Sequence, residues 1–403
     1  MAEQRYFIKL YDQALAAFGF VQDGPGAAYP CHLEIEPSTR HLLPMNLAAE
    51  PTDDELGRFL NTRRIPKGRA YVERLLAAYG IATSDTKGII DVTKGVSIND
   101  SYLVLAEDDP ITFEMCNLYE NAFDTALQIA AYTGVVSEDV FGSGLPSELT
   151  ASGSFPKAWR IIDDVRTLFK AGGISPAAEK AIEPYSELLA SQVARAMGLD
   201  AIEYDLAEWE GRVCSTCELF NTADVSFVPI YSALPRHAVA QFGLNRALEL
   251  YFDIGPTESS KLLSMLVFDS IIANKDRHFG NFGLLRDSRT GKALGMAPLF
   301  DHNLSLFCGE ADSALEPDEL LAARRRYSGT FATNLEAQLD YSMEEPQRMQ
   351  VARLADFEFE VPAEFLDRPC HERDAFTSKR LKALNHYIQR VARTAYQGTT
   401  CGS

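Results

Sequence analysis

Apolar residues recur at helical spacing in several segments of the chain, and this pattern predicts amphipathic or buried helices. The predicted helices cover residues 1–20, 53–62, 67–80, 118–132 and 184–197. A further helix is predicted to begin at Pro256, because proline is favoured in the first turn of a helix. Apolar residues surround most of the circumference of that helix, which is typical of a helix buried in a core.

Shorter apolar runs predict β-strands at residues 89–92, 102–106, 158–162, 165–170 and 212–220. The two runs on either side of Asp163 and Asp164 predict a β-hairpin, since a short polar turn separates them. Residues 21–52 are rich in proline and glycine and are predicted to be irregular.

The order of these elements predicts an α+β protein in three parts. Residues 1–147 are expected to form an accessory subdomain, residues 148–221 a small lobe with a sheet and a helix, and residues 222–403 a larger helical lobe. A cleft between two lobes is a usual place for a ligand, so we expect the functional site there.

Three polar residues after the Pro256 helix have the spacing that phosphoryl transfer from a nucleotide requires. Asp276 follows the helix, Asn281 comes five residues later, and Asp301 closes an apolar segment twenty residues beyond Asn281. Asp276 is predicted to orient the attacking hydroxyl group and to accept its proton. The oxygens of Asn281 and Asp301 suit Mg²⁺, which is a hard cation. Each residue alone could be an ordinary loop residue, whereas together they indicate a catalytic site.

Two residues inside this motif have open roles. His278 could contact the transferred phosphoryl group as a catalytic residue, or it could brace the loop by hydrogen bonds. Arg277 could pair with a phosphorylated or acidic group, or merely with a surface carboxylate.

A lysine and a glutamate upstream of the motif are candidates for nucleotide binding. Lys170 ends the second strand of the hairpin, where its ammonium group could reach phosphates. Glu187 lies one turn into the following helix, off its apolar stripe, and would hold the ammonium group in place. Glu183 is the rival partner, although it precedes Pro184 and lies at the helix boundary. Without the catalytic motif, either charge would be read equally well as a surface residue.

The turn before the hairpin is rich in small residues and contains Ser152, Gly153 and Ser154. Backbone N–H groups of such a turn could cradle phosphate oxygens, and Lys157 could add a phosphate contact or could be solvated. The signal is weak, because neither GxGxxG nor a P-loop motif is present.

Composition and charge narrow the possible partners. The net charge of -19 disfavours DNA, RNA and anionic lipid headgroups, and the basic run at residues 324–326 is read as a solvated helix face. An apolar segment long enough for a signal peptide or a membrane span is missing, so we expect a soluble cytoplasmic protein.

Seven scattered cysteines fit free thiols in a reducing compartment better than a disulfide framework. Cys214 and Cys217 form a CxxC motif, and zinc would need a second pair, for which Cys370 and His371 are candidates. Buried apolar cysteines on a strand are the default interpretation.

The segment Asp276-Arg-His-Phe-Gly-Asn281, together with Phe300-Asp301, resembles the HipA-like kinases, the bacterial serine/threonine kinases known from toxin–antitoxin modules. The resemblance covers about residues 148–310, with looser matches at residues 149–157, 169–170, 185–187, 197–199 and 218–220. The family's Asp-Phe-Asp is here Phe-Asp-His, which leaves His302 without an assigned role.

The resemblance implies a two-lobed protein-kinase-like fold with ATP between the lobes and Mg²⁺ at Asn281 and Asp301. It places Glu218 and Phe220 at the hinge that meets adenine. Some family members phosphorylate themselves on the phosphate loop, which by position implies Thr150, with Ser152 or Ser154 as alternatives.

Some members also bind a small DNA-binding antitoxin, and some phosphorylate aminoacyl-tRNA synthetases. The chain is therefore predicted to be an ATP- and Mg²⁺-dependent protein serine/threonine kinase that could act as a toxin. Its substrate would be a protein with a serine or threonine, and its partner a small antitoxin protein.

Other activities remain open. Phosphoinositide kinases also carry Asp-Arg-His followed by Asn, but the acidic composition is unfavourable for a lipid headgroup substrate. A pseudokinase or scaffold would bind nucleotide without turnover and would not need the base, Asp276. A DNA-binding regulator is disfavoured by the charge and by the lack of a convincing helix-turn-helix.

Overall fold

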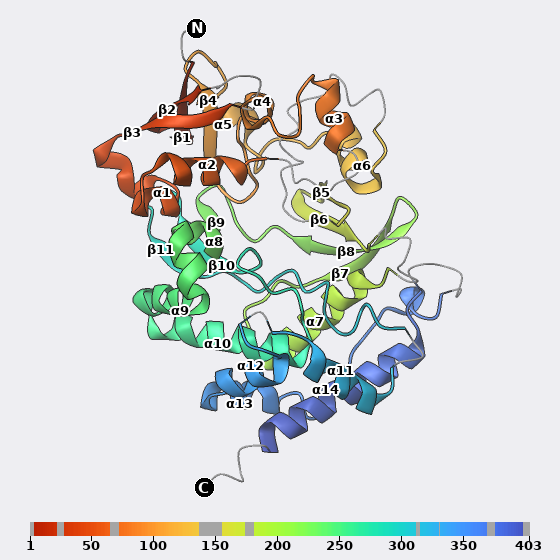
Figure 1. The fold of residues 1–403 in the computed structure, drawn as a ribbon. Coiled ribbons are helices and arrows are strands. Elements are labelled where there is room, and N and C mark those ends of the chain that lie inside the picture. Colours follow the sequence, from red (N-terminus) through yellow and green to blue (C-terminus); the bar gives the residue numbers. More distant parts are fainter. Residues whose placement is uncertain are drawn as a thin grey trace. The chain divides into compact units, whose positions relative to one another are not determined.

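The computed structural model describes residues 4–21, 28–64, 72–136, 155–173, 181–311, 315–329, 331–368 and 375–397. Within these ranges the protein combines many helices with several small sheets (Figure 1). The chain divides into two compact units, each assembled from segments that are far apart in the sequence. The first unit contains Met1–Leu168, Leu219–Arg246 and Gly283–Gly295, and the second contains Phe169–Glu218, Ala247–Phe282 and Met296–Ser403. The three-part domain division at residues 147 and 221 stays a prediction.

A four-stranded antiparallel sheet opens the first unit, with the strand order β3-β2-β1-β4. Its strands are β1 (Arg5–Leu10), β2 (Gln13–Val21), β3 (Tyr29–Ile35) and β4 (Tyr102–Ala106). The strand predicted at residues 102–106 is thus confirmed. Figure 1 shows β1, β2 and β3 in red beside α1 and α2.

The helix predicted over residues 1–20 is wrong, because this segment forms the β1–β2 hairpin. Tyr6, Ile8 and Leu10 are buried while their neighbours are more exposed, which is the alternation of a strand. The alanines of β2 favour a helix locally, but β1 also pairs with β4, from much later in the chain. This pairing and the burial of one face outweigh helix propensity.

Short helices pack against one face of this sheet and share its apolar core. They are η1 (Pro37–Leu42), α1 (Met45–Ala49), α2 (Asp53–Asn61) and α4 (Thr86–Thr93). The helix predicted at residues 53–62 is confirmed. Residues 21–52 are wrongly predicted as irregular throughout, since they contain β3, η1 and α1.

The strand predicted at residues 89–92 is also wrong, because these residues belong to α4. The carboxylate of Asp85 accepts a hydrogen bond from the Gly88 N–H group and caps that helix. The rest of this region contains α3 (Val72–Ala78), α5 (Phe113–Cys116) and α6 (Thr125–Thr133). The predicted helices at 67–80 and 118–132 are confirmed in part, with later starts in the described residues.

The predicted hairpin after residue 157 is confirmed. It consists of β5 (Lys157–Ile162) and β6 (Val165–Ala171), in a sheet of strand order β5-β6-β8-β7. Beyond it come β9 (Val225–Pro229), α8 (Ile230–Ala233), α9 (Arg236–Ile254), β10 (Gly283–Asp287) and β11 (Ala293–Met296).

Strands β9 and β10 approach so closely that one position requires glycine. Gly283 lies opposite Pro229, and a Cβ atom at Gly283 would lie 2.1 Å from the carbonyl oxygen of Val228. Only glycine fits there without moving the main chain.

The second unit is mostly helical. It contains α7 (Glu183–Met197), β7 (Asp205–Trp209), β8 (Arg212–Glu218), α10 (Pro256–Ile271), α11 (Pro317–Arg326), α12 (Leu335–Ser342), α13 (Glu345–Ala352), η5 (Ala363–Phe365) and α14 (Ser378–Gln397). Among the described residues, no helix has both the length and the apolar character needed to cross a membrane.

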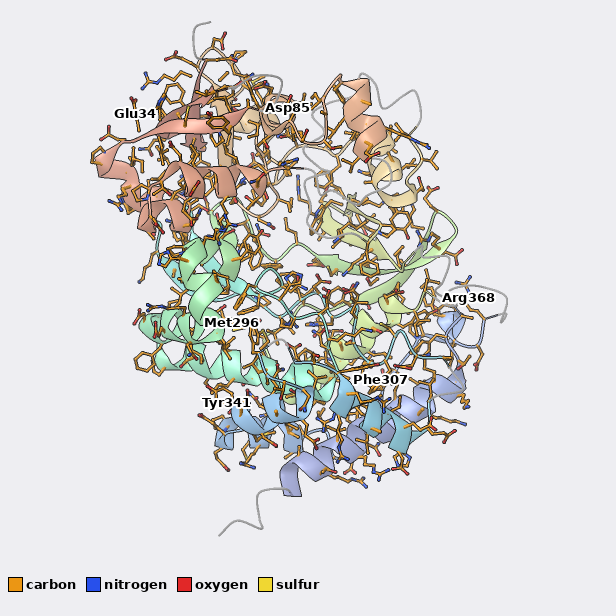
Figure 2. All side chains as sticks on the ribbon, in the orientation of Figure 1. Glu34, Asp85, Met296, Phe307, Tyr341 and Arg368 are labelled. Carbon is orange, nitrogen blue, oxygen red and sulfur yellow. The ribbon has the colours of Figure 1, made fainter. Side chains whose placement is uncertain are left out.

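The predictions for α7 and α10 are confirmed. Helix α7 has Pro184 in its first turn and ends at Gly198, whose φ of 75° suits glycine. Helix α10 begins at Pro256, and most of its apolar residues are buried, with contacts to α12, α13 and α14. Phe307, labelled in Figure 2, packs against Tyr387 of α14 with ring centroids 4.9 Å apart.

Candidate active site

Lys170, Glu187 and Asp301 meet in one ion-pair cluster of the second unit. The Nζ atom of Lys170 lies 2.7 Å from Oε1 of Glu187 and 2.5 Å from Oδ1 of Asp301. The lysine and the glutamate are nearly fully buried, while 28% of the Asp301 side chain stays exposed. The predicted pair of Lys170 with Glu187, rather than with Glu183, therefore forms, and it includes the predicted metal ligand Asp301.

A serine that the sequence analysis missed holds the glutamate in this cluster. The hydroxyl group of Ser215, on β8, donates a 2.5 Å hydrogen bond to Oε2 of Glu187. The same hydroxyl lies 3.3 Å from the carbonyl oxygen of Lys170. Both carboxylate oxygens of Glu187 thus have partners, so its side chain is fixed.

The electrostatics keep Lys170 charged. Burial of the ammonium group lowers its pKa, but the charges of Asp301 and Glu187 and their hydrogen bonds outweigh burial, so the pKa lies above its usual value. Asp301 adopts a left-handed backbone with φ of 59°, and its N–H group donates to the hydroxyl of Tyr204 at 3.2 Å. A permanently charged, immobilised ammonium group is suited to binding phosphate oxygens.

Asp276 and Asn281 are joined through the main chain of the loop that follows α10. The Nδ2 group of Asn281 donates to the carbonyl oxygen of Asp276 at 3.1 Å. The Asp276 N–H group in turn donates to Oδ1 of Asn274 at 3.0 Å. Because the amide nitrogen of Asn281 is engaged, its Oδ1 atom is the end available for a metal ion.

The Asp276 carboxyl group is half-buried, and burial raises its pKa above the usual value. Asp301 raises the pKa further, whereas the electrostatic interactions with His278, Lys170 and Arg277 lower it. A carboxylate with a raised pKa is a better proton acceptor, which suits the role of a base.

Arg277 is not at the surface, so of its two predicted roles the pairing with a surface carboxylate is wrong, and the pairing with an acidic group is the one observed. Its guanidinium group is 1% exposed and forms a bidentate ion pair with Asp269 of α10 at 2.8 and 3.0 Å. It also donates to the carbonyl oxygens of Asn281 and Phe300, and it lies 3.0 Å from Nδ1 of His302. His302, unassigned from sequence, is therefore part of the loop's support.

The lowered pKa of His302 fits this position. Burial lowers the pKa well below its usual value, and the charge of Arg277 lowers it further. The ring is therefore neutral and can accept a hydrogen bond from Arg277 through Nδ1.

Sequence reasoning also missed Asp269 and Asn274. The Nδ2 group of Asn274 donates a hydrogen bond to Oδ1 of Asp269 at 2.9 Å. A signal was present: Asp269 lies in a helix that is apolar around most of its circumference, and a charge buried there needs a partner.

His278 braces the loop. Its side chain is exposed, its Nδ1 atom accepts from the Gly280 N–H group at 3.0 Å, and its carbonyl oxygen accepts from the Asn281 N–H group at 2.8 Å. These contacts support the bracing interpretation, and a catalytic contact of His278 stays a prediction.

The predicted nucleotide-binding residues are only partly within the described chain. Thr150, Ser152, Gly153 and Ser154 lie outside it. Lys157 is buried at the start of β5, so the alternative of a solvated lysine is wrong.

The predicted hinge residues lie at the end of β8 and just after it. Glu218 is exposed at the end of β8, and Phe220 packs edge-on against Phe227 with ring centroids 5.4 Å apart. Contacts of these residues with a nucleotide stay predictions.

The oxygens of Asn281 and Asp301 fit Mg²⁺, because they are the hard ligands that this cation prefers. In the described parts of the chain, no group of three or more His, Cys, Asp or Glu residues could hold a metal. Cys214 and Cys217 are buried free thiols, and burial raises the pKa of Cys217 to about 12, which disfavours the thiolate that zinc needs. Cys370 and His371 lie outside the described residues.

Comparisons with known proteins identify a family for this chain. A family model described as the HipA-like C-terminal domain matches residues 151–363. No curated protein matches the chain significantly.

Several solved structures are similar to this chain, and two of them are described here. One is HipA of the Shewanella oneidensis MR-1 toxin–antitoxin system, in complex with HipB and its operator DNA. It aligns over 98% of this chain and 97% of that chain, with a TM-score of 0.54 and 11% identity. The other is the Helicobacter pylori proinflammatory kinase CtkA, which aligns over 62% of this chain and 92% of that chain, with a TM-score of 0.43 and 17% identity. The first likeness shows a shared fold over nearly the whole chain.

Proposed function

Because the chain belongs to the HipA-like C-terminal domain family, we propose that it is an ATP- and Mg²⁺-dependent protein serine/threonine kinase. The observation that carries this proposal is the cluster of Lys170 with Glu187 and Asp301. A buried lysine that is held by one glutamate and one partly exposed aspartate is what a kinase needs for the phosphates and the metal of a nucleotide. The loop with Asp276 and Asn281 adds a base and a second oxygen ligand.

Each side chain has a distinct role in this proposal. Lys170 holds phosphate oxygens, and Glu187 keeps its ammonium group in place. Asp276 accepts the proton of the attacking hydroxyl group, while Asn281 and Asp301 hold the metal. When bound, ATP would supply the phosphoryl group and Mg²⁺ would neutralise the negative charge that develops on it.

The finer features of the fold belong to the same proposal. We expect a two-lobed kinase arrangement, with a small β-rich lobe at residues 148–221 and a helical lobe at residues 222–403. The loop with Ser152, Gly153 and Ser154, together with Lys157, would contact phosphates. Glu218 and Phe220 would lie at the adenine.

The proposal also includes the regulation, partners and cellular location of the protein. Autophosphorylation at Thr150 would modify the phosphate loop and turn the activity off. HipA of Shewanella oneidensis is seen with HipB, and by analogy a small antitoxin protein is proposed as a partner here. The site of action would be the cytoplasm, with a protein as substrate and with neither nucleic acid nor membrane as a direct partner.

Incubation of the purified protein with γ-labelled ATP and Mg²⁺, followed by phosphopeptide mapping, tests the activity. Label on serine or threonine in the wild type but not in Asp276→Ala is the expected result. If ATP binds but the wild type carries no label on itself or on added proteins, the protein-kinase proposal is wrong. Label transferred to phosphoinositide vesicles instead would identify a lipid kinase. Unlabelled peptides between residues 149 and 157, with label elsewhere, would remove Thr150 as the modified site.

A further inference from the structure

One arginine joins the main chain beside both predicted metal ligands. The Nη1 atom of Arg277 donates to the carbonyl oxygen of Asn281 at 2.6 Å and to that of Phe300 at 2.8 Å. Phe300 directly precedes Asp301. Because a single nitrogen atom binds both carbonyl groups, the two stretches of main chain that carry Asn281 and Asp301 are held close together.

The other side of the guanidinium group is fixed to the core. Asp269 of α10 accepts two hydrogen bonds from it, and one oxygen of Asp269 also accepts from Asn274 at 2.9 Å. A further contact of 3.0 Å joins Nη2 to Nδ1 of His302, which directly follows Asp301. The chain is thus held on both sides of Asp301, through the carbonyl group of Phe300 and the side chain of His302, and the anchor Asp269 lies in the buried part of α10.

We propose that Arg277 is a positioning residue that sets the spacing of Asn281 and Asp301, and that it thereby determines how tightly the site binds a divalent metal together with a nucleotide. This inference rests on the proposed function. Arg277 is 1% exposed, so it acts through the two carbonyl groups and through His302 rather than by touching a substrate.

Lysine cannot replace this arginine. The guanidinium group uses all three of its nitrogen atoms for five contacts in fixed directions. An ammonium group keeps the charge but lacks the planar fork, so it cannot bind Asp269 and both carbonyl groups at once.

The test is the Mn²⁺ affinity of the full chain with a non-hydrolysable ATP analogue, measured from the free Mn²⁺ signal in electron paramagnetic resonance. In Arg277→Lys we expect the Mn²⁺ dissociation constant to rise by about tenfold or more, because outer-shell partners of metal sites have effects of this size. Binding of the analogue without metal should change little. If Arg277 had only a structural role, its replacement would change the affinity for Mn²⁺ and the affinity for the analogue to a similar extent.

Arg286→Lys is the matched control. Arg286 is another buried arginine that donates to three main-chain carbonyl groups, those of His41, Leu43 and Gly291. The Arg286→Lys variant should lose about as much free energy of unfolding as Arg277→Lys and should keep the wild-type Mn²⁺ affinity. Equal Mn²⁺ affinities in Arg277→Lys and the wild type would overturn the inference.

His302→Leu keeps the inference testable if Arg277→Lys does not fold. Leucine fills the buried space and removes only one of the five contacts, so we expect a smaller rise in the Mn²⁺ dissociation constant. Wild-type affinity in this variant would then overturn the inference. If the wild type binds Mn²⁺ but transfers no phosphate, only the proposed kinase activity is refuted. If the variants are active and their Mn²⁺ affinity is unchanged, only the positioning role of Arg277 is refuted.

Discussion

Arg277 and Arg286 show how one structural device serves two different ends. Each lies in a different unit, is almost fully buried, and donates to main-chain carbonyl groups of two or more separate segments. Arg286 has neutral acceptors: three carbonyl groups and the hydroxyl of Tyr102. Arg277 also has the carboxylate of Asp269.

The difference lies in what the tied segments carry. The segments at Arg286 carry the apolar Leu43 and the turn at Gly291, so the contacts stabilise the fold of the first unit. The segments at Arg277 carry Asn281 and Asp301, so contacts of the same kind support a candidate site. Hydrogen bonds to buried carbonyl groups stabilise any fold. Whether they also support a function depends on which side chains the bonded segments carry.

The largest expected effect is on phosphoryl transfer in the second unit. Asp276→Ala should reduce the rate by on the order of 10³-fold, because a positioned base contributes about this much. The loop should stay intact, since the hydrogen bonds of Asp276 to Asn274 and Asn281 use its main chain, which the substitution leaves unchanged. Rates with γ-labelled ATP and circular dichroism measure the two properties. Near wild-type turnover would show that Asp276 is not the base.

Lys170→Met tests the ion-pair cluster. The variant leaves Glu187 buried without its cation, which should lower the free energy of unfolding by about 3–5 kcal/mol. The matched control is Lys87→Met, which breaks the partly exposed pair with Asp91 and should cost less than about 1 kcal/mol. Urea unfolding compares them, and equal losses would contradict the buried cluster.

Arg286→Lys tests whether the buried arginine of the first unit stabilises the fold without affecting the candidate site. Loss of bonds to buried carbonyl groups should lower the free energy of unfolding by about 3 kcal/mol. Phosphoryl transfer at a temperature where the variant stays folded should equal that of the wild type. A large loss of transfer without unfolding would mean that Arg286 also supports the site.

The smallest effect is one of pH. Because the pKa of Asp276 lies above its ordinary 3.8, the carboxylate takes up a proton at a higher pH than an exposed aspartate does. The protonated form cannot accept the substrate proton, so kcat/KM should fall as the pH decreases through this raised pKa. The profile is measured over the pH range in which circular dichroism is constant. A midpoint at or below 3.8 would contradict the raised pKa.

The sequence predicted the elements around the site better than those of the N-terminal region. Helices α7 and α10 are marked by local signals, namely Pro184, Gly198 and Pro256. Strand β1 has no such marker: its conformation depends on pairing with β4, which follows only at residue 102. The alanines of β2 locally favour the wrong structure, and a pairing between distant segments cannot be read from either segment alone.

The candidate site was predicted unevenly for a similar reason. Asp276 and Asn281 lie in one short motif, and Lys170 with Glu187 follows from the order of strand and helix. Ser215 carries no sequence signal, because a serine on a strand becomes informative only when its neighbour is known. Asp269 did carry a signal, the presence of a charge in a buried helix, but its partner could not be named.

By itself, the sequence determined the helices with clear ends, the candidate catalytic motif and the identity of the groups that could carry the chemistry. Periodicity and capping are local, so they can be read along the chain. Only the tertiary structure decided that Asp301 shares Lys170 with Glu187 and that Arg277 supports the main chain beside Asn281 and Asp301. These contacts join segments that are distant in sequence, and burial gives each charged or polar group a partner that only the folded chain brings within reach.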